Sequence, residues 1–267
     1  MIEFKSFKDG KRHIVTFSYD DAPPEDYKLV EIFNKYGMKA TFNVNSNKFP
    51  SPYGVNTEDV KSLYEGHEIA VHTLNHPWVE KCANVSLINQ VLQDRQNIEK
   101  ECGYVVRGMA YPYGTYDDDS INTLKSCGIV YSRTAGETGG FNFPTDFMKW
   151  TGTCHHCNAI KHIDRFIGAL DSSWASNLFY IWGHSFEFPN SPDRGFDYME
   201  DICARLAEHK DKIWFATNIE IYDYIMAQKA LHVAADESFV YNPTQIDVWI
   251  VKDGTDYKIP AGETVRF

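Results

Sequence analysis

The sequence lacks a long apolar run, and this absence limits where the protein can work. No segment approaches the roughly 18–20 uncharged apolar residues that a transmembrane helix needs, and the mean hydropathy is −0.41. Residues 1–10 contain lysine and aspartate but no apolar run of the roughly 7–15 residues found in a signal peptide. We therefore expect a cytoplasmic protein, with a secreted form that has lost its leader as the alternative.

Positive charge is also scarce. The 267 residues include 26 Lys and Arg against 37 Asp and Glu, which gives a formal net charge of −11. No run of five like charges occurs, whereas nucleic-acid binding depends on clustered lysine and arginine. We expect neither nucleic acid nor a membrane as a partner, and the sequence leaves the oligomeric state open.

Cysteine is sparse for a protein of this length, with six residues in the whole chain. Without a leader sequence, this number favours buried free thiols over a disulfide framework. Cys154 and Cys157 form a C-x-x-C pair around His155 and His156, but a structural zinc site requires a second pair. We expect these four side chains to be surface or core residues, although the two histidines could still bind metal adventitiously.

Aromatic side chains, by contrast, are abundant, with 17 Phe, 16 Tyr and 6 Trp. Most of them must lie in the core, because 43% of the residues are hydrophobic and there is ample material for one. An excess of Tyr and Trp is also typical of carbohydrate-binding clefts.

Short β-rich runs alternate with longer helical patterns along most of the chain. The predicted strands are 13–19, 39–44, 68–71, 104–110, 129–132, 178–182 and 213–216. The predicted helices are 26–36, 58–65, 86–101, 117–126, 159–170, 198–209 and 218–228. Such alternation predicts an α/β fold with a parallel sheet, either open or closed into a barrel, whose functional groups lie at the carboxyl ends of the strands.

The pattern changes after about residue 230, where short β runs are separated by turns. The predicted strands there are 238–241, 245–252, 256–259 and 263–267. Asp253-Gly254 is typical of a hairpin turn. We therefore predict an α/β domain over residues 1–230 and a small antiparallel β extension over residues 231–267, packed on that domain.

Two groups of potential metal ligands follow predicted strands. Asp20 and Asp21 end the first strand, and His72 and His76 come directly after the third. Two imidazoles at this spacing can converge on one ion, and a set of two histidines and one carboxylate leaves coordination positions open for catalysis. The alternatives are a solvated turn for the aspartates and a chance pair for the histidines.

Two further features could take part in catalysis. The Tyr-Pro-Tyr-Gly turn at residues 111–114 offers backbone N–H groups that suit an oxyanion. His184 follows an apolar strand, where a general acid could lie, and a surface histidine is the alternative.

The order of these features resembles the polysaccharide deacetylases, the NodB-homology domains of carbohydrate esterase family four, over roughly residues 13–229. The resemblance rests on Asp20-Asp21, the H-T-L-N-H stretch at 72–76, the P-Y-G turn at 112–114 and His184. It implies a distorted (β/α)7 TIM-like barrel. It also implies a divalent metal ion held by Asp21, His72 and His76, most often zinc, with cobalt or another divalent ion as the alternative.

The resemblance also implies roles for individual residues. Asp20 is expected to be the general base, His184 the general acid, and the Tyr113 backbone N–H a donor to the oxyanion. The arginine that the family often has beside the base is absent from residues 110–114, and we expect Arg107 to replace it. Asp146 is the predicted partner of His184, and together with Tyr111, Trp150 and Trp182 it is expected to line the substrate cleft.

We therefore predict a metal-dependent hydrolase that removes N-acetyl or O-acetyl groups from a poly- or oligosaccharide. One alternative is a carbohydrate-binding protein that retains the metal site without turnover. Another is a different metal-dependent C–N or ester hydrolase on the same barrel. The polymer and the type of bond stay open, because specificity lies in loops such as 49–56, 135–143 and 186–195.

Overall fold

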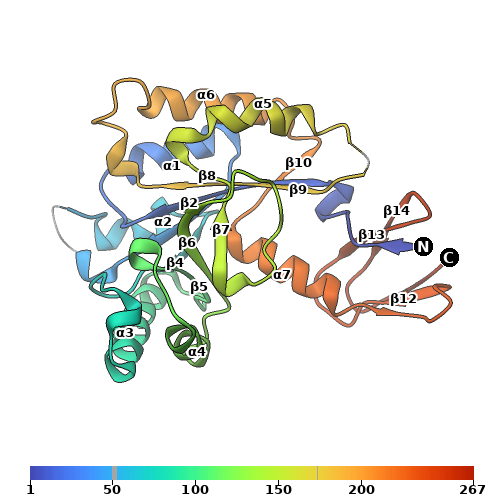
Figure 1. Cartoon of the computed structure of the whole chain (residues 1–267), viewed down its shortest axis with the longest axis horizontal. Coiled ribbons are helices and arrows are strands. Elements are labelled where there is room, and N and C mark those ends of the chain that lie inside the picture. The colour runs from blue at the N-terminus through green and yellow to red at the C-terminus, as the bar shows by residue number, and fades with distance from the viewer. Residues whose placement is uncertain (50–52, 173) are drawn as a thin grey trace.

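The computed structural model describes residues 1–49, 53–172 and 174–267 (Figure 1). The main sheet in this part of the chain has nine strands, and all of its strand pairs are parallel. These strands are β2 (His13–Asp20), β3 (Ala40–Val44), β4 (Glu68–Val71), β5 (Gly108–Ala110), β6 (Tyr131–Glu137), β7 (Trp150–Gly152), β8 (Cys154–His155), β9 (Asn177–Gly183) and β10 (Ile213–Phe215). The predicted loop at 49–56 lies partly outside the described residues, since 50–52 are not among them.

The sheet curls into a barrel because its two end strands are consecutive in the sequence. The strand order is β7-β6-β5-β4-β3-β2-β9-β8, and Thr153 alone separates β7 from β8. The Thr153 N–H donates to the Tyr180 carbonyl at 2.8 Å, which ties this junction to β9. β10 pairs with the first half of β2 and β3 with the second half. The predicted distorted barrel is therefore confirmed.

Helices cover the outside of the barrel, with α1, α5 and α6 on one side and α3 and α4 on another (Figure 1). The helices are α1 (Asp26–Tyr36), α2 (Val60–Leu63), α3 (Asn84–Cys102), α4 (Asp118–Ser126), α5 (Ile160–Gly168), α6 (Phe196–Ala207) and α7 (Asn218–Lys229). Gly37 and Gly103 end α1 and α3 in the left-handed conformation that glycine adopts without strain. Capping boxes begin α4 and α7.

Short 3-10 turns follow several strands and carry residues of the site described below. They are η1 (Lys8–Gly10), η2 (Ser46–Lys48), η3 (Thr57–Asp59), η4 (Val79–Lys81), η5 (Pro112–Gly114), η6 (Phe147–Lys149), η7 (His156–Asn158) and η8 (Ser185–Glu187).

Two differences from the predicted elements have local causes. The strand predicted at 104–110 forms only over β5, because the Val106 N–H is bound at 2.9 Å by the Glu99 carboxylate rather than by a neighbouring strand. Strands β7 and β8 were not predicted. They are only three and two residues long, Trp-Thr-Gly and Cys-His, which is too short to show the alternation of a half-buried strand.

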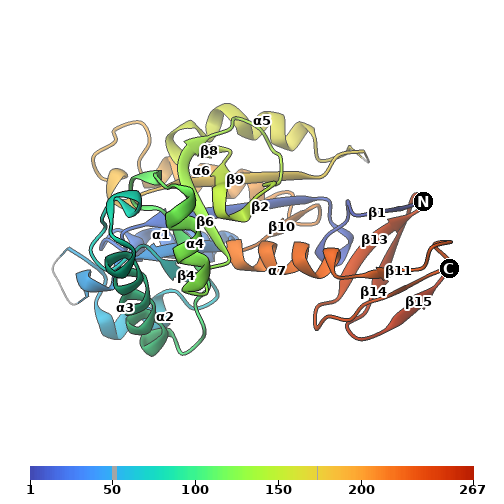
Figure 2. The same ribbon diagram turned by 60° about the horizontal axis from the view of Figure 1, so that its bottom comes forward.

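The C-terminal extension is built from both ends of the chain. β1 (Ile2–Glu3) pairs with β13 (Val248–Lys252), which pairs with β14 (Thr255–Ile259). A second small sheet joins β11 (His232–Val233), β12 (Phe239–Tyr241) and β15 (Thr264–Arg266). Both sheets are antiparallel, as predicted, and Figure 2 shows the two termini together in this part of the molecule. The boundary predicted at residue 230 therefore leaves out the contribution of β1.

The hairpin signal at Asp253-Gly254 is confirmed. These two residues connect β13 to β14 with φ values of 50° and 85°, the backbone that a two-residue hairpin requires. The extension has a small core of its own, formed by Leu231, Val240, Val248, Ile250 and Ile259. Ala227, near the end of α7, packs in the same cluster and joins the extension to the barrel.

All six cysteines lie among the described residues and are free. Four are buried, as predicted, whereas Cys82 and Cys157 are half-buried. Within residues 1–49, 53–172 and 174–267, no helix has the length and apolar character needed to cross a membrane.

Glu68 on β4 predicts a pH dependence of stability. Its buried carboxylate accepts hydrogen bonds from Thr41, Tyr131 and the Ile219 N–H, at 2.7–2.9 Å. Burial raises its pKa to about 7. The folded chain then binds more protons than the unfolded chain between the ordinary glutamate pKa and about 7, so stability is lost as the pH rises through this window.

We expect Glu68→Gln to lose less stability than the parent protein between pH 5 and 8. The slope of the unfolding free energy against pH should differ between the two proteins by at most about 1.4 kcal/mol per pH unit. Urea unfolding at several pH values measures it, and the exposed Glu65→Gln is the matched control. Equal slopes for the parent and Glu68→Gln would contradict the prediction.

Candidate active site

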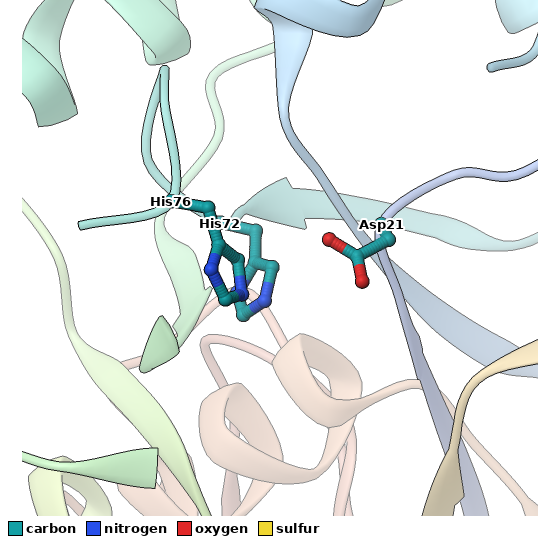
Figure 3. A group of neighbouring side chains, drawn as sticks. All are labelled: Asp21, His72 and His76. Carbon is teal, nitrogen blue, oxygen red and sulfur yellow. The ribbon is translucent and has the colours of Figure 1, made fainter. Parts of the chain in front are cut away.

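The predicted metal ligands meet at the carboxyl ends of two barrel strands. Asp21 directly follows β2, and His72 directly follows β4, from which a short loop leads to His76. Figure 3 shows the two imidazole rings side by side, facing Asp21 across a gap. The potential ligand atoms of the three side chains all lie within 4.8 Å of one another. The structure thus brings together the three residues that the sequence singled out.

His72 is held in the orientation that a metal ligand needs. Its Nδ1 lies 2.8 Å from the Ala110 carbonyl oxygen, which can only accept a hydrogen bond, so Nδ1 carries the proton. The lone pair is then on Nε2, which faces the aspartates. Asp94 accepts the His72 backbone N–H at 3.2 Å and fixes the chain at this point. This outer arrangement is typical of metal-bound histidine.

The protonation states also fit a divalent ion. Burial lowers the pKa of His72 to about 4 and lowers that of His76, so both imidazoles are neutral near pH 7. Burial raises the pKa of Asp21, but His72 and Lys48 outweigh it and bring the pKa below its ordinary value. The Lys48 ammonium lies 2.8 Å from Asp21 Oδ1, so this carboxylate already attracts a cation.

Backbone strain is concentrated at the same place. Asp21, Thr73, His76 and Tyr113 have φ values of 77°, 63°, 55° and 60°, a region that residues with side chains rarely adopt. Such conformations persist where the surrounding structure imposes them, commonly at functional sites. The strained turns aim Asp21 and His76 at the shared gap and place Tyr113 beside it, since the His76 and Tyr113 ring centres are 4.5 Å apart.

Asp20 lies at the centre of a buried charge cluster. Its Oδ2 is 3.9 Å from His72 Nε2 and 3.9 Å from His184 Nε2. The same oxygen accepts a hydrogen bond from Arg133, while Oδ1 accepts one from Asn43 at 2.9 Å. Burial raises the Asp20 pKa, and the opposing effect of Arg133, His72 and His184 is larger, so the pKa lies below its usual range. Asp20 is therefore an ionised carboxylate placed between two imidazoles.

The prediction that Arg107 stands beside the base is wrong. Arg107 lies just before β5, at the opposite end of the barrel, where its guanidinium binds both oxygens of Asp223 at 3.1 and 2.5 Å. Arg133 of β6 takes the expected place beside Asp20. In the register of the two strands, Arg133 pairs with Ala110, the last residue of β5, and so lies at the carboxyl end.

The predicted pairing of Asp146 with His184 is also wrong. Asp146 is exposed and accepts the Met148 N–H at 2.9 Å at the start of η6, before β7 and away from His184. Glu187 is the partner instead, with Oε1 2.9 Å from His184 Nδ1. Burial lowers the His184 pKa, but Glu187 and Asp20 outweigh burial and raise it above its ordinary value. Glu187 and Asp20 thus favour the protonated form of His184.

The aromatic residues expected to line the cleft are mostly core residues. Tyr111 and Trp150 are each 1% exposed. The Tyr111 hydroxyl donates to the Met148 carbonyl, and Trp150 packs against Tyr131. Neither can contact a substrate, which corrects that prediction.

Trp182 is buried as well, but it belongs to the wall of the site. Its ring centre lies 4.7 Å from the Arg133 guanidinium, and the indole N–H donates to the Gly136 carbonyl. The aromatic surface that remains open is formed by Trp78, Tyr113 and Phe186, which are 42%, 49% and 41% exposed.

Sequence reasoning missed Arg133, Glu187 and Trp78, although each left a signal. Arg133 follows the apolar run of a predicted strand, where a charged residue is unexpected. Glu187 lies three residues after His184, and Trp78 two residues after His76. None of these signals identifies a role until the strand neighbours are known.

Comparison with known proteins points to one family. The family model described as polysaccharide deacetylase matches residues 7–132. This segment contains Asp20, Asp21, His72, His76 and Tyr113, and it ends one residue before Arg133.

Curated relatives match the same part of the chain. A chitooligosaccharide deacetylase from Sinorhizobium fredii is 28% identical over 124 residues, which cover 43% of this chain and 54% of the relative. The peptidoglycan-N-acetylglucosamine deacetylase PgdA from Listeria monocytogenes is 30% identical over 115 residues, 42% of this chain and 23% of the relative. The match thus spans about half of the first relative and a quarter of the second.

Solved structures share the fold over a longer range. Peptidoglycan deacetylase PdaC from Bacillus subtilis, solved as a mutant, has a TM-score of 0.53 at 16% identity, over 81% of this chain and 93% of that chain. A family 4 carbohydrate esterase from Streptomyces lividans, in complex with acetate, has a TM-score of 0.50 at 15% identity, over 76% and 91%.

A pseudoenzyme of the same esterase family, from Bacillus anthracis, has a TM-score of 0.53 at 15% identity, over 78% of this chain and 64% of that chain. The shared fold therefore does not by itself show turnover. The family model, the curated relatives and the ordered motifs nevertheless agree, and residues 7–132 of this chain are similar to the polysaccharide deacetylases.

Proposed function

We propose that this chain removes acetyl groups from an acetylated carbohydrate by hydrolysis, with the aid of a divalent metal ion. Zinc is the favoured ion. One observation carries the proposal. The ionised Asp20 lies between His72 of the ligand trio and His184, with its Oδ2 3.9 Å from the Nε2 atom of each. A candidate base and a candidate acid thus lie beside the residues that would hold a metal ion.

Asp21, His72 and His76 would hold the ion. Their two neutral imidazoles and one carboxylate form the donor set of catalytic zinc sites, which keep a position open. A divalent ion in such a site supplies Lewis-acid chemistry, which activates water and polarises a carbonyl group.

Asp20 acts as the general base. Because its pKa is below the ordinary range, the carboxylate is free of a proton near pH 7 and accepts one from the attacking water. The Arg133 and Asn43 hydrogen bonds hold both oxygens in place, so the carboxylate does not have to reorient during the reaction.

His184 acts as the general acid. Glu187 binds Nδ1, so the proton delivered to the leaving amine or alcohol comes from Nε2, which faces Asp20. The oxyanion forms beside the turn at Tyr113, whose backbone N–H is the proposed donor. Because φ is 60° at Tyr113, the backbone of this turn runs in a direction different from that of an ordinary turn.

A carbohydrate substrate fits the exposed aromatic surface. The Trp78 and Tyr113 rings stack with centres 3.9 Å apart at 12°, and the His76 ring meets the Tyr113 ring edge-on at 4.5 Å. Partly exposed aromatic rings next to a candidate metal ligand suit contact with the apolar face of a sugar ring. The relatives named as chitooligosaccharide and peptidoglycan-N-acetylglucosamine deacetylases favour an N-acetylated sugar.

Acetate release tests the proposal. The chain is stripped of metal, reloaded with Zn²⁺ or Co²⁺, and incubated with chitooligosaccharides, peptidoglycan fragments and acetylated xylan. We expect acetate from at least one substrate, only after reloading. The panel also separates amide from ester substrates. Sugar binding without acetate release from any substrate would contradict the proposal and favour the carbohydrate-binding alternative.

Trp78→Ala tests the aromatic surface separately. Losing a stacked ring should raise KM by about 3–10-fold, the equivalent of roughly 0.5–1.5 kcal/mol, with kcat little changed. Trp174→Ala is the matched control, because Trp174 is 87% exposed and lies on the loop before β9. An unchanged KM in Trp78→Ala, with the same substrate, would place the sugar elsewhere.

A further inference from the structure

A second cluster of potential metal ligands lies next to His184. His155, His156 and Glu187 each offer one ligand atom, and these atoms lie within 4.8 Å of one another. We propose that this cluster binds a second divalent metal ion of the zinc class. The inference is independent of the proposed deacetylase activity, because metal uptake alone tests it.

The chain is folded so that two consecutive histidines face the same side. Consecutive residues of a strand point to opposite faces, but β8 ends at His155 and η7 begins at His156. The turn brings the two ring centres to 4.3 Å from each other. Glu187 comes from η8 after the neighbouring strand β9, so all three residues lie at the carboxyl end of the barrel.

The distances fit ligands that share an ion. His155 Nε2 and His156 Nε2 are each 3.2 Å from the same oxygen, Oε2 of Glu187. Ligand atoms at about 2.0–2.1 Å from a tetrahedral zinc ion are roughly 3.3 Å apart. Charge-assisted N–H···O hydrogen bonds are shorter, about 2.7–2.9 Å. The same donor set of two imidazoles and one carboxylate forms the Asp21 site.

The surroundings hold the imidazoles in place. His155 Nδ1 accepts the Cys157 backbone N–H at 3.4 Å and lies 3.1 Å from Cys157 Sγ, and these two contacts fix the orientation of the ring. The His156 ring is stacked between Tyr19 and Phe188, with ring centres at 5.8 and 4.5 Å. A Cβ atom at residue 183 would lie 2.0 Å from His156 Nδ1, so glycine is required there.

An ion can reach this site and would remain partly open to water. His155 and Glu187 have side chains that are 13% and 32% exposed, whereas His156 forms the buried floor at 2%. Burial keeps His156 neutral by lowering its pKa, and the neutral imidazole is the form that binds metal.

The site would be coupled to the general acid. Glu187 uses Oε2 for the cluster and Oε1 for His184 Nδ1, so one carboxylate bridges the second ion and the His184 imidazole. A metal ion at Oε2 would fix the orientation of Glu187, as outer partners do for metal-bound histidine. Thus the motif Cys154-His155-His156-Cys157 acts through its histidines rather than its thiols.

Metal stoichiometry tests the proposal on the full chain. The metal-free protein is titrated with Zn²⁺ alone and with Co²⁺ alone, and bound metal is measured by equilibrium dialysis and by the Co²⁺ absorption spectrum. We expect two ions per chain in the parent protein and one in His155→Gln, whose affinity for the second ion should fall by at least roughly 10–100-fold. Glu187→Gln should behave in the same way.

Two control variants make the result specific. His76→Gln should lose the other ion and keep this one, and His162→Gln on α5 should keep both. Circular dichroism establishes that each variant is folded, and His155 is a suitable target because its side chain is partly exposed. One ion per chain in the parent protein at saturating metal, retained by both His155→Gln and Glu187→Gln, would overturn the proposal and leave an ion-pair network around Glu187. A second ion retained by both His155→Gln and Glu187→Gln would overturn it as well.

Discussion

Asp20→Asn is expected to lower kcat for acetate release by about 10²–10⁴-fold while the chain still takes up metal at the Asp21 site. An asparagine has nearly the shape of aspartate and can still accept the Arg133 hydrogen bond, but it cannot accept the proton of water. The effect should therefore fall on kcat rather than on substrate binding or metal binding.

Steady-state kinetics with the best substrate of the panel measures this change, together with metal content for each sample. Asp146→Asn is the matched control, because Asp146 only binds the Met148 N–H and an asparagine can do the same. It should retain the parental kcat. Full activity in Asp20→Asn would remove Asp20 from the role of base, and loss of metal from that variant would make it a ligand instead.

Arg133→Met is expected to destabilise the fold by about 3–5 kcal/mol, because it leaves the Asp20 charge buried and unpaired. Arg133 and Asp20 have side chains that are 1% and 5% exposed. Burial raises the Asp20 pKa, and Arg133 makes the largest contribution that lowers it. Loss of the guanidinium should therefore raise this pKa. Activity should fall together with stability, since the base would lose both its charge and its fixed position.

Arg107→Met provides the contrast. Arg107 and Asp223 have side chains that are 36% and 33% exposed, and exposed ion pairs contribute about 0–1 kcal/mol. Urea unfolding should therefore show a small change for Arg107→Met, with unchanged kcat. The double variant Asp20→Asn/Arg133→Met should be less destabilised than the sum of its single variants, because the two charges interact directly. A large kcat loss in Arg107→Met, or additive single effects, would refute this assignment of the two arginines.

The group formed by the proposed metal ligands could be predicted because the placement of these residues depends on local sequence. Asp21 and His72 each follow an apolar strand directly, and parallel strands bring their carboxyl ends to one rim of the barrel. Knowing the order of the strands was not necessary for this conclusion. The same reasoning applies to His184, which follows β9.

The partners of these residues could not be predicted in the same way. Arg107 and Arg133 flank short apolar segments and look equivalent in the sequence, yet Arg107 lies before β5 and Arg133 within β6. The two arginines therefore lie at opposite ends of the barrel, separated by the length of a strand. Asp146 and Glu187 differ similarly, because Asp146 precedes β7 whereas Glu187 follows β9.

Burial was also decided by packing rather than by residue type. Trp150 and Trp78 are chemically the same side chain, but Trp150 begins a strand inside the closed barrel and Trp78 lies on an open loop after His76. The closure itself depends on β7 and β8, which are too short to show a strand pattern.

The sequence by itself determined the resemblance to polysaccharide deacetylases, the parallel α/β architecture, the hairpin at Asp253-Gly254 and the residues that end the strands, because these follow from local periodicity, turn chemistry and ordered motifs. Only the tertiary structure decided that Arg133 and Glu187 serve Asp20 and His184. It also decided that His155 and His156 turn towards one carboxylate. Such contacts join strands far apart in the sequence, and they depend on strand order, register and side-chain direction, which only the closed barrel defines.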